Sequence, residues 1–150
     1  MARTAQVFGI LFAGFVLVCV ALAGAGWWWW KTHSAELIET AKTVIEQGKA
    51  EGAKLDEGGC LELAMERHRG AGEQSLTTVM TDSMWLTSCL HASKRQADFC
   101  TNVPGSSHPI DYSKWANEQC AARGFKDAYC GALMQTVSAY CESPQRAQKP

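Results

Sequence analysis

The sequence has no excess of charge of either sign. It contains 14 Lys and Arg and 15 Asp and Glu among 150 residues, for a formal net charge of −1. Proteins that bind nucleic acid usually present a clustered basic face, and basic membrane patches also depend on runs of Lys or Arg. We therefore expect no nucleic-acid partner and no polybasic contact with lipid.

Sequence motifs of common catalytic and cofactor sites are also missing. There is no C-x-x-C pair, so a thioredoxin-like redox centre and a zinc ribbon have no support. C-x-x-C-H, G-x-S-x-G, H-E-x-x-H and the P-loop are likewise absent. We expect a protein that is not an enzyme, with no catalytic residue, no cofactor and no metal.

The histidines lack the spacing that lets two residues of one helix bind the same metal. None lies three or four residues from another. The four are His33, His68, His91 and His108. We predict scattered surface histidines, with a metal or non-covalent haem site as the alternative.

The chain also lacks the alternating pattern of a half-buried strand, and apolar residues recur instead at helical spacing. Helices are predicted over about 34–54, 60–69, 76–100, 112–123 and 128–142. The predicted fold class is all-α: an N-terminal transmembrane helix followed by a small disulfide-stapled helical domain, built on an antiparallel helical hairpin.

This fold divides the chain into five expected parts. They are a cytoplasmic N-terminus at 1–6, a transmembrane anchor at 7–30, a stalk or covering helix at 31–55, the disulfide-stapled helical domain at 56–142, and a disordered tail at 143–150.

A long uncharged segment, residues 7–30, predicts the membrane anchor. A helix of this length spans roughly 36 Å, enough to cross a hydrocarbon core of roughly 30 Å. Trp27–Trp30 end the segment, and indole rings favour the headgroup boundary. The alternative is a secretory signal cleaved after Ala23 or Ala25, which follow small-x-small patterns.

Cysteine usage indicates the compartment. Six of the seven cysteines follow the apolar segment, and a dense, even set is typical of oxidising compartments. Arg3 before the segment adds a slight positive-inside bias. We expect a single-pass protein of a bacterial inner membrane with its C-terminal domain periplasmic or extracellular. Cys19 lies within the apolar run and is expected to be an ordinary membrane cysteine.

Two cysteine pairs share one spacing: ten residues separate Cys89 from Cys100 and Cys130 from Cys141. Eleven steps along an α-helix end roughly 20° past three full turns, so both members of a pair would share one face. Two such helices packed antiparallel would place Cys89 opposite Cys141 and Cys100 opposite Cys130. We predict these two disulfides.

The remaining pair is then Cys60 with Cys120. Six cysteines allow 15 connectivities, and sequence alone does not exclude the others. The main rival is Cys120–Cys130, which becomes feasible if Gly124 ends the intervening helix. Each bridge is expected to add about 2–4 kcal/mol by restricting the unfolded chain.

The spacing resembles that of the twin-cysteine helical hairpins of the mitochondrial intermembrane space. In both, two helices each carry a cysteine pair about three turns apart. The resemblance covers only Cys89 to Cys141. Those hairpins have nine residues between paired cysteines where this chain has ten, and a short loop where this chain has a whole predicted helix. It implies the same physical solution and assigns no family.

Trp85 and Trp115 are the large aromatics of the predicted domain. Each is either a core residue or part of an interface, because tryptophan is enriched at binding hot spots. We expect a non-catalytic, membrane-anchored interaction domain or an accessory subunit of a membrane complex, with the bilayer and another protein as partners. The alternatives are an envelope redox or metal- or haem-binding protein, and a secreted helical effector released by signal cleavage.

Overall fold

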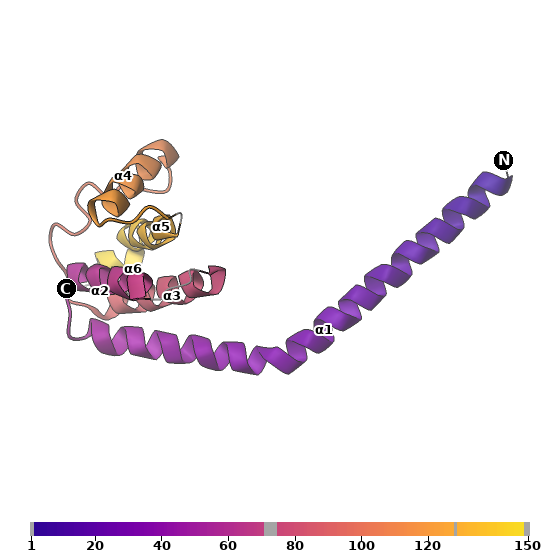
Figure 1. Cartoon of the computed structure of the whole chain (residues 1–150), viewed down its shortest axis with the longest axis horizontal. Helices are drawn as coiled ribbons and strands as arrows, with labels where there is room; N and C mark the ends of the chain where they lie inside the picture. Colours follow the sequence, from indigo (N-terminus) through magenta and orange to yellow (C-terminus); the bar gives the residue numbers. More distant parts are fainter. Residues whose placement is uncertain (1, 71–74, 128, 149–150) are drawn as a thin grey trace. The chain divides into compact units, whose positions relative to one another are not determined.

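The elements formed by the residues that the structure describes are all helices, and the all-α prediction is confirmed. The computed structural model describes residues 2–70, 75–127 and 129–148, with side chains from residue 14 onward except that of residue 33. The helices are α1 (Ala2–Gly52), α2 (Glu57–Gly70), α3 (Leu76–Ala92), α4 (Pro109–Ala122), α5 (Cys130–Cys141) and α6 (Pro144–Ala147) (Figure 1). Among these residues no strand forms, apart from an isolated bridge between Asp56 and Lys94.

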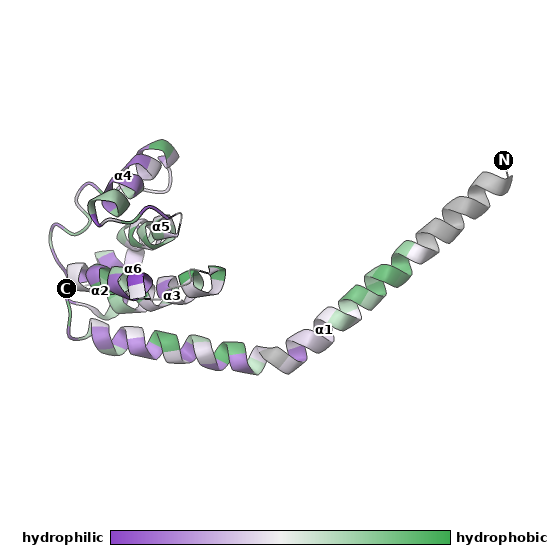
Figure 2. Ribbon diagram, in the orientation of Figure 1, coloured by the Kyte–Doolittle hydropathy of each residue, from purple (hydrophilic) through white to green (hydrophobic). Residues whose placement is uncertain are grey.

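Two compact units divide the chain, Met1–Thr40 and Ala41–Pro150. In the first, α1 carries an apolar stretch, Gly14–Thr32, that is long enough to cross a membrane and has a mean hydropathy of 1.2. None of that stretch is buried, and Figure 2 shows its hydrophobic residues as a green run. A signal sequence has the same properties, so the finding supports a membrane span or a signal.

The second unit includes the last turns of α1, which pack against α3. A Cβ added at Gly48 would lie 2.5 Å from the Trp85 carbonyl oxygen. One added at Gly52 would collide with the carbonyl oxygen of Cys89. Only glycine lets the two backbones approach this closely, which explains two residues that are otherwise unfavourable inside a helix.

The antiparallel helix pair of the domain is α2 with α3. Asp56 begins α2 by accepting a hydrogen bond from the Gly59 N–H at 2.7 Å, a typical N-cap contact. The start of α2 lies beside the end of α3, where Cys60 is bonded to Cys89. The two helices therefore run antiparallel, and they are not the pair that was predicted to do so.

The third helix ends at Ala92, eight residues before the predicted end at 100. The next residues leave the helix to pair with the segment before α2: the Lys94 N–H donates to the Leu55 carbonyl at 2.9 Å. The Gln96 N–H donates to the Glu57 carboxylate, also at 2.9 Å. Cys100 therefore lies off the helix that carries Cys89, and the shared spacing has no geometric meaning.

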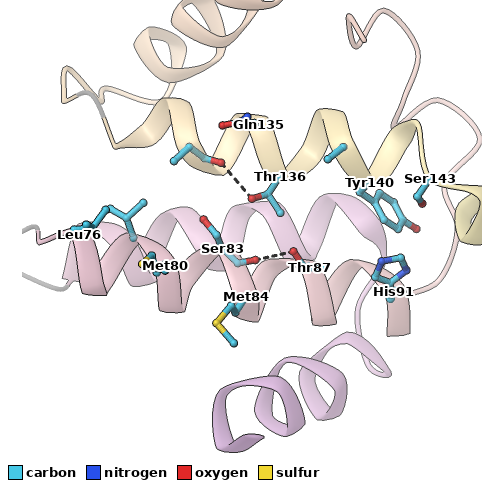
Figure 3. Close-up of a pocket in the computed structure, with 13 residues that line it drawn as sticks. Leu76, Met80, Ser83, Met84, Thr87, His91, Gln135, Thr136, Tyr140 and Ser143 are labelled. Carbon is cyan, nitrogen blue, oxygen red and sulfur yellow. Dashed lines mark hydrogen bonds between the residues drawn. The ribbon is translucent and has the colours of Figure 1, made fainter. Parts of the chain in front are cut away.

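The fifth helix runs parallel to α3, not antiparallel. Figure 3 shows both chains advancing in the same direction, and the rings of His91 and Tyr140 meet near the two C-terminal ends at 5.2 Å. The predicted bridge to Cys141 does not form because Cys89 faces α2, where it is bonded to Cys60. In Figure 1, α5 lies between α4 and the α2–α3 pair.

All six cysteines of the domain form disulfides, with paired Cα atoms 5.6–6.0 Å apart. The pairs are Cys60–Cys89, Cys100–Cys141 and Cys120–Cys130. The three predicted pairings, Cys89–Cys141, Cys100–Cys130 and Cys60–Cys120, are wrong. The rival Cys120–Cys130 is the pair that forms, because Gly124, at φ +79°, ends the helix between them.

The C-terminal segment is ordered where a disordered tail was predicted. Ser143 accepts a hydrogen bond from the Arg146 N–H and starts the short helix α6. The Arg146 side chain is buried against Glu57 at 3.0 Å. This ion pair fixes the segment to α2; residues 149–150 lie outside the described part.

Candidate functional site

A groove of about 590 Å³ lies between the parallel helices α3 and α5 (Figure 3). Its volume is in the range of ligand and peptide sites. Residues of α3, α5 and the start of α6 line it: Leu76, Val79, Met80, Ser83, Met84, Thr87, His91, Ala132, Gln135, Thr136, Ala139, Tyr140 and Ser143.

Apolar side chains of this groove are exposed at its first end. Leu76 is 69% and Met80 58% exposed, whereas Val79 beside them is buried. An α-helix places residues three and four apart on one face, so Leu76, Val79 and Met80 form a short apolar strip along α3. Among the described residues, no protein partner removes Leu76 or Met80 from water, whereas Val79 belongs to the core.

Hydroxyl groups in the lining are already satisfied by their own helices. Thr87 donates to the Ser83 carbonyl at 2.8 Å, and Thr136 donates to the Ala132 carbonyl at 3.2 Å. Figure 3 draws both hydrogen bonds. A threonine that bonds to its own helix has little remaining donor capacity. The lining is therefore more apolar than its count of hydroxyl residues suggests.

Charge is nearly absent from the two helices that form the groove. The sequence of α5 contains no charged residue. That of α3 contains Asp82, which is buried away from the groove lining, and His91. A ligand that enters this groove would therefore desolvate few charges and would gain no ion pair from the lining.

The second end of the groove is fixed by a buried polar network. The Tyr140 hydroxyl donates to the Glu57 carboxylate at 2.7 Å. Burial, and next the hydrogen bond to Glu57, raise the pKa of Tyr140 far above its usual value, so this hydroxyl remains protonated. The tyrosine ring is thereby held in one position as a wall of the groove.

Glu57 in turn is surrounded by donors. Besides Tyr140, it accepts from the Arg146 guanidinium through both oxygens and from the Gln96 N–H. Burial raises the pKa of Glu57, but the hydrogen bonds from Tyr140, Gln96 and Arg146 outweigh it, and the net shift is downward. Glu57 is therefore a buried carboxylate held in its charged form.

The predicted interface tryptophans do not form the groove. Trp85 is 1% exposed and belongs to the core, with the Arg67 guanidinium 4.9 Å from its ring centre. The core alternative therefore describes Trp85, because α3 turns this face toward α2. Trp115 is half-buried, packs against the core and lines a smaller cavity; its interface role stays a prediction.

The histidines are only partly as predicted. His91 and His108 are exposed, but His68 is completely buried, so the surface prediction is wrong for that residue. His33 lies outside the described side chains. Nothing in the spacing around His68 indicates its burial, because its neighbours Asp82 and Asp127 are distant in sequence. Among the described residues, no group of three His, Cys, Asp or Glu is arranged to hold a metal ion.

No family model matches the chain, and neither a curated protein nor a solved structure matches it.

Proposed function

We propose that this chain is a single-pass membrane protein whose disulfide-stabilised domain, on the periplasmic or outer side of a bacterial inner membrane, binds another protein. The domain would act without catalysis, as an interaction module or as an accessory subunit of a membrane complex. The apolar stretch Gly14–Thr32 supports the anchor. The three disulfides support the oxidising compartment.

The partner would place an apolar helical segment in the groove between α3 and α5. The observation that carries this proposal is the largely apolar lining, which contains one histidine and no Asp, Glu, Lys or Arg, with Leu76 and Met80 exposed at one end. Between Leu76 and His91 the groove follows about four helical turns, roughly 22 Å. That length fits the i, i+3, i+4, i+7 anchors by which an amphipathic helix binds in a groove.

Methionine suits such a role because its unbranched thioether adapts to different apolar partners. Met80 and Met84 lie one helical turn apart in the lining. A charged substitution at Met80 would leave the fold intact, since the side chain is exposed, and would place an unpaired charge in the interface.

The experiment compares two exposed apolar residues. Met80→Glu alters the groove, whereas Ile110→Glu alters α4 at a residue that is 83% exposed and outside the groove. The full chain, with a photo-crosslinking amino acid at position 80, is irradiated in its native membranes, and the crosslinked peptide is identified by mass spectrometry.

The expected result is a crosslink from position 80 to an apolar helical segment of one protein. The crosslink should be lost when the same chain also carries Met84→Glu, and it should be retained when the chain carries Ile110→Glu instead. Association with that protein should weaken at least tenfold in Met80→Glu. A crosslink to lipid alone, or equal association of the two glutamate variants, would contradict the proposal.

A secreted form is the second candidate, because the same apolar stretch fits a signal sequence. The intact mass of the mature chain separates the two. An uncleaved chain retains the residues up to Ala25, whereas cleavage after Ala23 or Ala25 removes most of the apolar stretch and leaves Trp27–Trp30 near the new N-terminus.

A further inference from the structure

The imidazole of His68 is buried between two carboxylates from separate parts of the domain. Its Nδ1 lies 3.5 Å from Asp82 Oδ2 on α3. Its Nε2 lies 3.3 Å from Asp127 Oδ1, in the segment between α4 and α5. The His68 ring has no exposed surface and Asp82 is nearly buried, whereas the Asp127 side chain is 28% exposed. Three segments of the domain therefore meet at this ring.

Two of the contacting atoms lack a hydrogen bond. His68 Nδ1 and Asp82 Oδ2 are both buried and face each other, yet neither has a partner at hydrogen-bond geometry. Buried polar atoms are nearly always paired, because an unpaired one costs the free energy of its desolvation. A neutral imidazole has only one N–H, so it cannot donate a hydrogen bond to both carboxylates at once. A further proton between His68 Nδ1 and Asp82 Oδ2 would give both buried atoms a partner.

The other charged groups near the ring are on α2. Arg67 Nε lies 3.8 Å from Asp82 Oδ1. The Arg69 guanidinium stacks on Phe125 at 4.9 Å, and the Phe125 ring lies 5.7 Å from the His68 ring.

One further ion pair borders this region: Arg123 bonds the Glu62 carboxylate at 3.1 Å. The charge that faces the imidazole is therefore that of Asp82 and Asp127, partly offset by Arg67.

We infer that His68, Asp82 and Asp127 form a proton-binding site, in which one proton shared between His68 Nδ1 and Asp82 Oδ2 joins α2 to α3 while Nε2–H bonds Asp127. With that proton bound, both sides of the ring carry an N–H···O or N···H–O contact. When it leaves, the imidazole keeps one N–H. A nitrogen lone pair then faces a carboxylate oxygen, and one of the two contacts becomes repulsive.

The two carboxyl groups have opposite titration behaviour, which agrees with this division of roles. Burial raises the pKa of Asp82 by more than the opposing charges of Arg67 and His68 lower it. Burial also raises the pKa of Asp127, but hydrogen bonds from the Cys130 N–H and the His68 ring outweigh it, and the net shift is downward. Asp127 therefore remains a charged acceptor, and Asp82 is the group that shares the proton.

Asp127 extends the contact to the start of α5. Its Oδ1 also accepts hydrogen bonds from the backbone N–H groups of Tyr129 and Cys130, at 3.0 and 2.9 Å. The protonated site thus connects α2 and α3 to the N-terminus of the helix that forms one wall of the groove. Loss of the proton would loosen this connection.

The direction of the pH effect follows from proton counting. The proton that the inferred site shares is one that an imidazole of the unfolded chain releases near pH 6.5. The folded state then binds one more proton than the unfolded state above about pH 6.5. Its stability falls as pH rises, by up to tenfold in the unfolding constant per pH unit.

The test uses the full chain in detergent, unfolded by urea from about pH 5.5 to about pH 8.5, the range around imidazole titration. The variants are His68→Gln and, as the matched control, His108→Gln, which changes an exposed histidine. The wild type and His108→Gln should lose stability with the same slope as pH rises, whereas His68→Gln should show little pH dependence.

A second measurement does not depend on a variant that folds. Nitrogen NMR of the histidine-labelled wild type should reveal one ring whose nitrogen shifts keep the signature of the proton-bound site at about pH 7.5, where free imidazole has lost its proton. Equal pH slopes for all three proteins, or four rings that all titrate like free imidazole, would overturn the inference.

Discussion

Arg146 Nε lies 3.0 Å from Glu57 Oε1, although 89 residues separate them in sequence. The contact joins the last helix to the first turn of α2 inside the domain, where Glu57 is completely buried. Removing one partner of a buried ion pair leaves the other charge uncompensated. The C-terminal segment is therefore part of the folded domain.

Arg146→Ala should lower the free energy of unfolding by about 3–5 kcal/mol, because the Glu57 carboxylate would remain buried without its main charge partner. Urea unfolding of the full chain, followed by circular dichroism, measures the change. Lys114→Ala, at an exposed position on α4, is the control and should stay within about 0.5 kcal/mol of wild type. A loss equal to that of the control would show that the ion pair contributes nothing.

Acid should destabilise the domain through Glu57. Its pKa in the fold lies below the ordinary value of 4.5, so its contribution to stability is present above that value. The contribution is lost as pH falls through the pKa of the folded state. Unfolding midpoints measured at about pH 5, 4 and 3 should fall steeply for wild type and less steeply for Glu57→Gln. Parallel curves for the two proteins would contradict the assigned direction.

Alanine at Gly48 should destabilise the domain, whereas alanine at Gly131 should not. The added Cβ at position 48 would lie 2.5 Å from the Trp85 carbonyl oxygen, a backbone atom that has little freedom to move. We expect a loss of about 1–3 kcal/mol, as for other overpacked sites. Gly131 lies in α5 with no atom within 4 Å of its added Cβ, and its replacement should add about 0.5–1 kcal/mol. Thermal or urea unfolding of the two variants measures both changes in stability. Opposite signs indicate that the close approach of α1 to α3 requires Gly48, whereas a gain in both would indicate that only helix propensity matters.

The three disulfides should be reduced in a fixed order. Cys60 and Cys89 have no exposed surface, Cys120 and Cys130 have little, and Cys100 and Cys141 are half-buried. A thiolate must reach a sulfur atom to exchange with it, so Cys100–Cys141 should open first and Cys60–Cys89 last. Graded treatment with a small thiol, alkylation and peptide mass analysis give the order. Early reduction of Cys60–Cys89 would contradict the burial seen here.

Helical periodicity predicted the position of most elements because each helix buries one apolar face. At the start of α5, Asp127 accepts hydrogen bonds from the N–H groups of Tyr129 and Cys130, as a capping residue does. Such contacts are local, within three residues of the cap, and local sequence specifies them.

The end of α3 and the disulfide pairing depend on long-range contacts, which the sequence pattern does not show. Nothing near Ala92 marks the end of α3, because the helix ends where Lys94 pairs with Leu55 from another part of the chain. Once that helix is shortened, Cys100 no longer shares a face with Cys89, and the predicted pairing fails. Disulfide connectivity depends on this tertiary geometry and not on spacing alone.

The groove and the burial of His68 could not be predicted from the sequence, because both depend on contacts between distant segments. Met80 and Met84 lie at helical spacing that is equally typical of a core face, and only the parallel packing of α5 leaves part of that face open. The burial of His68 depends on Asp82 and Asp127, which the fold brings together from separate segments.

Disulfide mapping of the unreduced full chain tests most directly the claim that an oxidised, cross-linked domain follows the apolar helix. Trypsin leaves Cys130 and Cys141 in one peptide, 127–146, so cleavage after Met134 with cyanogen bromide is needed to separate them. We predict that peptide 127–134 is linked to 115–123, that 135–146 is linked to 96–114, and that 55–65 is linked to 85–94. Free thiols at these six positions, or a link between 85–94 and 135–146, would contradict the account.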